Sequence, residues 1–159
     1  MLKSLDIFIL YLKRFEILAK CCQLIIYKAF TGKMTAVFII DDDSIHQRIA
    51  QIMIEKHQLF DHYTSFTDAE KAIAFIKENK SNDHVLPDVI LLDLNMPVID
   101  GWDFLDLFEK FRQEIKKVIR IFIVTSSVDE NDIVRSKAYS SVTGFISKPL
   151  SPDIIRSTI

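Results

Sequence analysis

The sequence predicts an α/β fold built on an open, doubly wound parallel sheet of five strands with helices on both faces. Two observations carry this prediction. Between residues 36 and 159, short apolar segments alternate five times with helix-like segments, and the apolar segments at 36–40 (AVFII) and 88–92 (DVILL) run almost without interruption. Continuous apolar runs are typical of parallel strands that are buried on both faces. Apolar residues make up 49% of the 159 residues, enough for one hydrophobic core.

The first two strand–helix units lie between residues 36 and 80. The strand at 36–40 precedes a helix that Ser44 can cap, and the apolar residues of that helix have helical spacing, namely Ile45, Ile49, Ile52 and Met53. A weaker strand is expected at 62–66. The sequence Thr67-Asp68-Ala69-Glu70 is typical of a capping box and predicts a helix over 68–80.

Three further units complete the predicted sheet. The strand at 88–92 is followed by a helix whose apolar stripe consists of Phe104, Leu105, Phe108 and Phe111. The fourth strand, 119–124, precedes a polar helix over 129–139. The fifth strand, 144–147, is followed by Ser151-Pro152, an N-cap with proline at the first helical position. Units of this length favour a doubly wound sheet with helices on both faces.

Residues 1–35 differ in composition from the rest of the chain. They carry six basic and two acidic side chains, a net charge of +4, and the charges face away from the apolar residues on a helical wheel. This predicts an amphipathic helical extension. Three interpretations remain open: a helix that binds a partner or a membrane surface, a helix docked on the domain itself, and upstream sequence that precedes a translation start at Met34. The longest charge-free run, 21–27, is too short to span a membrane.

Composition excludes several classes of protein. The net charge of −2 provides no basic footprint for nucleic acid. The three glycines, at 32, 101 and 144, are too far apart to form a nucleotide-binding loop. The two cysteines are adjacent, which rules out a disulfide framework and favours a reducing compartment, so a cytoplasmic protein is expected.

Charged and polar side chains follow four of the five predicted strands: Asp41 and Asp42, Asp93, Thr125 and Lys148. The carboxyl ends of parallel strands meet at one edge of a sheet, where ligands bind, so we expect these side chains to lie close together. The acids after the first strand can also be interpreted as ordinary residues at a helix N-terminus, favoured by the helix dipole. That interpretation does not account for Asp93, which directly follows a buried strand.

Three converging carboxylates predict a bound cation. Two carboxylates about 4 Å apart repel by about 4 kcal/mol at an effective dielectric of about 20, a large cost for a fold worth about 5–15 kcal/mol. Lys148 can neutralise one charge, whereas a divalent ion neutralises two. Mg²⁺ or Mn²⁺ fits better than zinc, because no histidine or cysteine occurs at these strand ends. The four scattered histidines are predicted to be surface residues, namely His46, His57, His62 and His84.

Two further features are predicted to be structural. The basic residues Arg112, Lys116, Lys117 and Arg120 surround the start of the fourth strand, at the end of the sheet opposite the acids, and are predicted to form a solvated face. Trp102 opens the third helix and is predicted to pack rather than to bind a ligand.

Four motifs, FIIDDD, LLDLNMPVIDG, IVTSS and GFISKP, occur in this order with compatible spacing. Over residues 36–159 they resemble the receiver domain of bacterial two-component response regulators. The resemblance implies a flavodoxin-like fold with strand order 2-1-3-4-5. It also implies a stand-alone phosphoacceptor module, because the chain ends eleven residues after Lys148 and leaves no room for an output domain.

The resemblance also implies roles for individual residues. Asp93 matches the aspartate that accepts a phosphoryl group from a sensor histidine kinase or a histidine phosphotransfer protein. Asp41 and Asp42 match the acidic pair that holds Mg²⁺, together with Asp93 and the backbone carbonyl of Asn95. In this family the domain catalyses only its own phosphorylation and dephosphorylation.

The remaining matches concern the response to phosphorylation. Thr125 and Phe145 match the hydroxyl and aromatic switch positions, Lys148 matches the family lysine, and Pro149 matches a cis-proline. The output is then expected to be a downstream protein that binds the fourth helix, fifth strand and fifth helix. The alternative is a phosphatase or phosphotransferase with an aspartate nucleophile, as in haloacid-dehalogenase-like enzymes. Those enzymes carry D-x-D at the first strand, whereas Asp93 follows the third.

Overall fold

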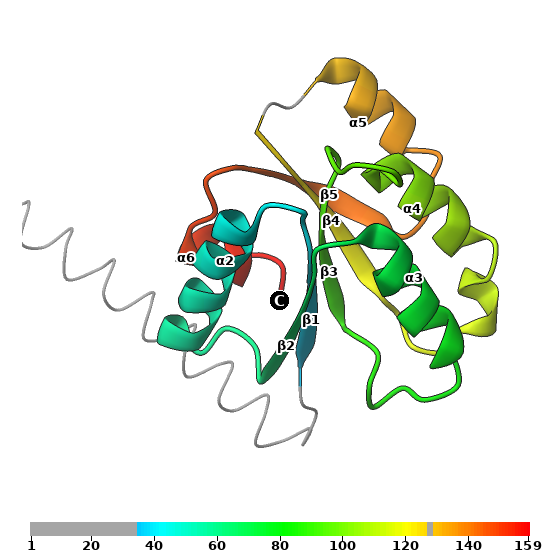
Figure 1. Cartoon of the computed structure of the whole chain (residues 1–159), viewed down its shortest axis with the longest axis horizontal. Helices are drawn as coiled ribbons and strands as arrows, with labels where there is room; N and C mark the ends of the chain where they lie inside the picture. Colours follow the sequence, from blue (N-terminus) through cyan, green and yellow to red (C-terminus); the bar gives the residue numbers. More distant parts are fainter. Residues whose placement is uncertain (1–34, 127–128) are drawn as a thin grey trace, which may run out of the picture. The chain divides into compact units, whose positions relative to one another are not determined.

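In the computed structural model, which describes residues 35–126 and 129–159, five parallel strands form one sheet in the order β2-β1-β3-β4-β5 (Figure 1). The strands are β1 (Ala36–Ile40), β2 (His62–Phe66), β3 (Val89–Asp93), β4 (Arg120–Thr125) and β5 (Val142–Ser147). The expected doubly wound topology and strand order are therefore confirmed. The predicted helix over 1–35 lies outside the described residues.

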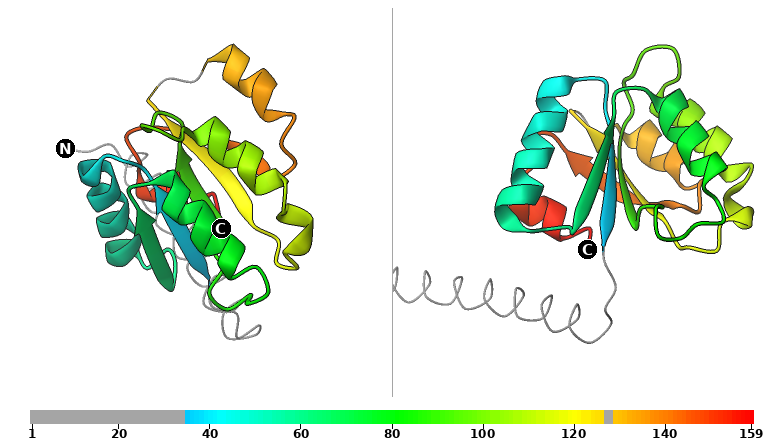
Figure 2. Two further views of the ribbon diagram at one scale, coloured as in Figure 1. Left: turned by 45° about the vertical axis from the view of Figure 1, so that its right-hand side comes forward. Right: turned by 60° about the horizontal axis from the view of Figure 1, so that its bottom comes forward.

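Helices cover both faces of this sheet. They are α2 (Ser44–His57), α3 (Ala69–Glu78), α4 (Gly101–Glu109), α5 (Glu130–Ser136) and α6 (Pro152–Arg156), with a short 3-10 helix, η1, at Arg112–Glu114. Figure 2 shows α2 and α6 on one face, and α3, α4 and α5 on the other. No helix in the part of the chain that the structure describes is both long and apolar enough to cross a bilayer.

The core has two halves, one on each face of the sheet. Alternate side chains of a strand point to opposite faces, so Phe38 and Ile40 pack on the α3 and α4 side while Val37 and Ile39 pack on the α2 and α6 side. The predicted stripe of α4 is buried as expected: Phe104, Leu105, Phe108 and the following Phe111. The described residues, 35–126 and 129–159, belong to one compact unit.

The two first helix caps differ from the prediction. Asp43 rather than Ser44 caps α2, since its side chain accepts hydrogen bonds from the backbone N–H groups of Ile45 and His46. Asp68 likewise caps α3, in place of the predicted box that begins at Thr67. In both cases the neighbouring aspartate is preferred because a carboxylate is a charged acceptor and lies at the positive end of the helix dipole.

Only some of the apolar residues that have helical spacing in α2 face the core, among them Met53, which is partly buried against it. The buried residues are Gln47, Ala50 and Ile54, whereas Ile45 and Ile52 are 68% and 41% exposed. The reason is Gln47, whose side-chain amide donates hydrogen bonds to the carbonyl oxygens of Asp41 (2.6 Å) and Phe66 (2.9 Å). These bonds join α2 to the ends of β1 and β2 and rotate Ile45 towards solvent.

Several element ends also differ by a few residues. The predicted helix over 129–139 ends at Ser136, and β5 begins at Val142 instead of residue 144. The third strand begins at Val89 instead of residue 88. The Asp88 side chain accepts a hydrogen bond from the backbone N–H of Ala36 (2.9 Å) and pairs with the Lys117 ammonium (3.2 Å).

Candidate functional site

Three carboxylates meet at the carboxyl edge of the sheet. Ile40 of β1 pairs with Leu92 of β3, so the next residues, Asp41 and Asp93, leave adjacent strands at the same level. Asp42 joins them, and one carboxylate oxygen from each of the three lies within 4.8 Å of the others. Asp41 and Asp93 are each 5% exposed, whereas Asp42 faces solvent. The site is therefore a niche with two buried acids and an open side.

Lys148 enters this niche from the end of β5. Its ammonium nitrogen lies 2.9 Å from Asp41 Oδ2 and 3.2 Å from Asp93 Oδ2, and its side chain is 11% exposed. Its backbone N–H donates to the carbonyl of Thr125 (2.8 Å), which fixes where the side chain leaves the sheet. The Lys148–Pro149 peptide bond is cis, as expected. One cation is thus shared between two buried acids.

Burial and charge set the protonation behaviour of this group. Burial raises the pKa of the Asp93 carboxyl above its usual value; Lys148 and the Asn95 backbone N–H oppose this, and the Asp41 charge adds to it. Burial alone would lower the pKa of Lys148, but hydrogen bonds and charge interactions with Asp41 and Asp93 outweigh it and raise that pKa. The niche therefore has excess negative charge that one lysine does not fully compensate.

The donor set fits a hard divalent cation. The three clustered groups are all carboxylates, which are ligands that Mg²⁺ and Mn²⁺ prefer, and the exposed Asp42 leaves an open side where such an ion can keep several waters. Asn95, two residues after Asp93, is exposed beside the cluster and its N–H donates to Asp93.

Thr125 and Phe145 occupy neighbouring strands. Asp93 pairs with Val124 of β4, so Thr125 lies one residue beyond it at the same edge, and Thr125 is buried. Phe145 lies in β5, three residues before Lys148, and packs half-buried against the core half that covers the α3 and α4 face. The structure therefore brings Thr125 to the acidic edge and places Phe145 away from it, along the strand that carries Lys148.

The turn after Asp93 is tightly packed. A Cβ on Gly101, the first residue of α4, would lie 2.5 Å from the Asp93 carbonyl oxygen and 2.8 Å from Leu94 Cα. The Gly101 N–H also donates to the Leu94 carbonyl (3.0 Å). Between them, Val98 has a positive φ of 70° and is 95% exposed. Helix α4 is thus held directly against the backbone of Asp93.

His46 is a site residue that the sequence analysis missed. His46 was predicted to be a surface residue. Its side chain is 42% exposed, but its Nδ1 lies 3.1 Å from the Lys148 ammonium nitrogen. No histidine occurs at the strand ends, as the sequence analysis stated, but His46 reaches the site from helix α2. A signal was available: His46 follows the acids by one helical turn, so the first turn of α2 carries its side chain back over Asp43.

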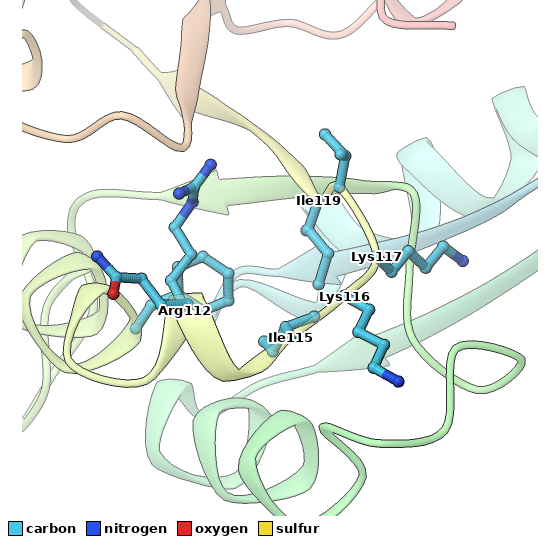
Figure 3. A pocket seen from close by; sticks show the side chains of 8 residues that line it. Arg112, Ile115, Lys116, Lys117 and Ile119 are labelled. Carbon is cyan, nitrogen blue, oxygen red and sulfur yellow. The ribbon is translucent and has the colours of Figure 1, made fainter.

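Three of the four basic residues around the start of β4, Arg112, Lys116 and Lys117, line a separate pocket of about 120 Å³ (Figure 3). Their interpretation as a solvated face was wrong for Lys117, whose side chain is 11% exposed, pairs with Asp88, and donates to the Leu86 carbonyl at 2.6 Å. Arg120 donates to the carbonyl of Ile159 (3.3 Å). The contacts of Lys117 and Arg120 therefore join segments of the fold at the end of the sheet opposite the acids. Trp102 packs as predicted, with 7% exposure.

Solved structures share this fold closely. A two component response regulator from Cytophaga hutchinsonii superposes with a TM-score of 0.71 at 30% identity, covering 79% of this chain and 93% of that one. A response regulator receiver protein from Dyadobacter fermentans gives a TM-score of 0.67 at 28% identity, covering 78% of this chain and 94% of that one.

Curated relatives match the same part of the chain. A probable methanogenesis regulatory protein, FilR2 of Methanothrix harundinacea, is 25% identical over 124 residues, or 77% of each chain. The sensor histidine kinase CheAY of Helicobacter pylori is 27% identical over 123 residues, which are 77% of this chain and 14% of the kinase. The chain therefore spans most of the first relative and a small part of the second.

A family model described as the response regulator receiver domain matches residues 37–159. The match covers the sheet except for Ala36, the first residue of β1, and it includes every residue of the acidic niche. The strand order, the position of the acids at the carboxyl edge and the similar proteins agree with it. The chain belongs to the response regulator receiver domain family of two-component signalling.

Proposed function

We propose that Asp93 accepts a phosphoryl group from a sensor histidine kinase or a histidine phosphotransfer protein. The observation that carries this proposal is the shared lysine: Lys148 lies within 3.2 Å of both Asp93 and Asp41, at the carboxyl edge of the sheet. A buried carboxylate that lies beside a fixed ammonium group and is open on one side is suited to receiving an anionic group, provided that the charge of the neighbouring acids is screened.

The reaction is a transfer between two residues. A carboxylate oxygen of Asp93 forms a bond to phosphorus as the bond from phosphorus to the donor's histidine nitrogen breaks, and the imidazole leaves with that electron pair. The product is an acyl phosphate on Asp93. Little proton transfer is needed, so charge stabilisation dominates the chemistry. The Lys148 ammonium, already 3.2 Å from Asp93, stabilises the phosphoryl oxygens.

Mg²⁺ or Mn²⁺ is the cofactor we propose for this site. Asp41, Asp42 and Asp93 would hold it, together with the backbone carbonyl of Asn95. When bound, the ion supplies positive charge that screens the repulsion between the acids and the incoming phosphoryl group. The protein itself positions the reacting groups, because the edge of the sheet holds Asp93 and Lys148 in contact with each other.

The acyl phosphate then changes the surroundings of Thr125 and Lys148. A hydrogen bond to a charged group is worth about 1.5–3 kcal/mol, whereas moving a two-state switch from about 1:99 to 99:1 requires about 5.5 kcal/mol. Thr125 alone therefore does not drive the change; Thr125, Lys148 and the metal contacts act together. Phe145 reorients inward as the distant response, and a downstream protein binds the surface formed by α5, β5 and α6.

Phosphate-affinity gel electrophoresis tests the proposal directly. After incubation with acetyl phosphate and MgCl₂, the wild-type chain should migrate more slowly, and EDTA should prevent the shift. Asp93→Asn should not shift. Asp83→Asn, a matched change at an exposed carboxylate far from the niche, should shift like the wild type. A shifted band for Asp93→Asn would contradict the assignment.

The same incubation distinguishes the alternative of an aspartate-nucleophile phosphatase or phosphotransferase. A receiver incorporates about one equivalent of phosphoryl group and then stops, whereas an enzyme with turnover releases many equivalents of phosphate. Measuring free phosphate over time therefore separates the two functions.

A further inference from the structure

His46 makes a contact in the niche that the proposed function leaves unused. Its Nδ1 lies 3.1 Å from the Lys148 ammonium nitrogen, although the two residues are 102 positions apart in sequence. The carboxylates of Asp43 and Asp41 are farther from Nδ1, at 3.5 and 3.7 Å. The His46 backbone N–H donates to Asp43 Oδ1 (3.3 Å), which fixes the backbone position from which the imidazole extends.

The partner of this contact assigns the tautomer of His46. An ammonium group only donates hydrogen bonds, so Nδ1 must accept from Lys148, and the proton of the neutral imidazole lies on Nε2. Lys148 has three N–H donors, and three acceptors surround it: Asp41 Oδ2 at 2.9 Å, His46 Nδ1 at 3.1 Å and Asp93 Oδ2 at 3.2 Å. Each N–H donor of Lys148 therefore has one acceptor, and the His46 imidazole is the only one of the three acceptors that is not a carboxylate.

We propose that His46 is a positioning residue that holds the Lys148 ammonium over Asp93. This inference rests on the proposed function, because it concerns the rate at which Asp93 is phosphorylated. A bound cation and a phosphoryl group would both compete for the oxygens of Asp41 and Asp93, so these two acceptors would orient Lys148 less strongly than they do now. His46 keeps its acceptor, since it belongs to α2 and takes no part in either event.

A lysine side chain has several rotatable bonds, and a third contact limits the conformations it samples. With His46 in place, the ammonium is already oriented towards the reacting oxygens, so less freedom is lost in reaching the transition state. His46 acts through Lys148 and need not touch the phosphoryl group.

Three substitutions at His46 distinguish the effect of its Nδ1 acceptor from the effect of the size of its ring. The side chain of asparagine places a carbonyl oxygen near the position of Nδ1, so His46→Asn keeps the acceptor. His46→Gln places its acceptor near Nε2 instead, and His46→Leu has none. Because the His46 side chain is 42% exposed, none of the three should disturb folding, which thermal unfolding will check.

The experiment measures Asp93 labelling by acetyl phosphate at saturating MgCl₂ over a range of donor concentrations. His46→Leu and His46→Gln should lower the maximal rate by about three- to tenfold, the effect of one net hydrogen bond, with little change in the half-saturating donor concentration. His46→Asn should stay within about twofold of the wild type.

The outcomes are distinguishable. If His46→Leu labels at the wild-type rate, or His46→Asn is as slow as His46→Leu, the positioning role is wrong although Asp93 remains the acceptor. A wild-type chain that is not labelled at Asp93 overturns the proposed function and this inference together. The positioning role is supported if the maximal labelling rate is low in His46→Leu and close to the wild-type rate in His46→Asn.

Discussion

Substitution of Gly101 by alanine should destabilise the domain, because α4 begins against the backbone of Asp93. The added Cβ would lie 2.5 Å from the Asp93 carbonyl oxygen and 2.8 Å from Leu94 Cα, where ordinary contact begins at 3.4 Å. Both atoms belong to the backbone, so the turn must move by about 0.9 Å, an overpacking that costs about 1–3 kcal/mol. Alanine has a better helix propensity than glycine, which stabilises the folded state by about 0.5–1 kcal/mol. The difference spans about 0–2.5 kcal/mol, and because both close contacts are with backbone atoms, the net loss expected is about 1–2 kcal/mol.

Thermal unfolding followed by circular dichroism measures this loss. For a domain of about 125 residues, about 1 kcal/mol corresponds to about 4 °C, so Gly101→Ala should lower Tm by about 4–8 °C. Gly144→Ala is the matched control, since its Cβ would meet only the Phe122 ring, at 3.7 Å. Its Tm should be unchanged or slightly higher. If Gly101→Ala melts within about 1 °C of the wild type, or no lower than Gly144→Ala, close approach is not the reason for glycine at this turn.

Three further predictions concern stability. Lys117→Met removes the ammonium group beside the buried Asp88 and should cost about 3 kcal/mol in urea unfolding; a loss below about 1 kcal/mol would contradict the structural role of this pair. Val98→Gly removes a β-branched residue at a φ of 70° and should raise the urea midpoint, by about 0.5–1 kcal/mol in stability, whereas a lower midpoint would show that Val98 is unstrained. The third prediction concerns the metal-free protein in EDTA. Because the pKa of Asp93 is raised, the folded state binds the Asp93 proton more tightly than the unfolded state does. The free energy of unfolding therefore falls as the pH rises from 3.8, the usual pKa of the group, through the raised pKa. Asp93→Asn should therefore be more stable than the wild type at pH 7, by on the order of 1 kcal/mol, with the difference shrinking towards pH 4; a less stable variant at pH 7 would refute the sign.

Much of the fold could be predicted from local patterns. The continuous apolar runs at 36–40 and 88–92 form the central strands β1 and β3, and the spacing of the following segments matches the helices that the structure contains. Such patterns are readable because burial on both faces of a strand, or on one face of a helix, constrains residues that are near in sequence. The ends of elements were less predictable, since they depend on caps such as Asp43 and on side chains such as Asp88 that bind distant groups.

The grouping of Asp41, Asp42, Asp93 and Lys148 also followed from sequence, because each residue lies at or just beyond the carboxyl end of a predicted strand. Parallel strands bring those ends to one edge whatever the loops between them. The exact partners did not follow. Only the folded chain shows that one ammonium is shared by two acids and an imidazole.

By itself, then, the sequence determined the layered sheet and the edge on which its acids lie, since both depend on the order of strands and the residue at each strand end. Tertiary structure alone decided which way α2 is rotated, that His46 contacts Lys148, and that Lys117 is buried with Asp88. Those features depend on hydrogen bonds and ion pairs between residues that are up to 102 positions apart, and no local periodicity encodes which of several polar groups will meet.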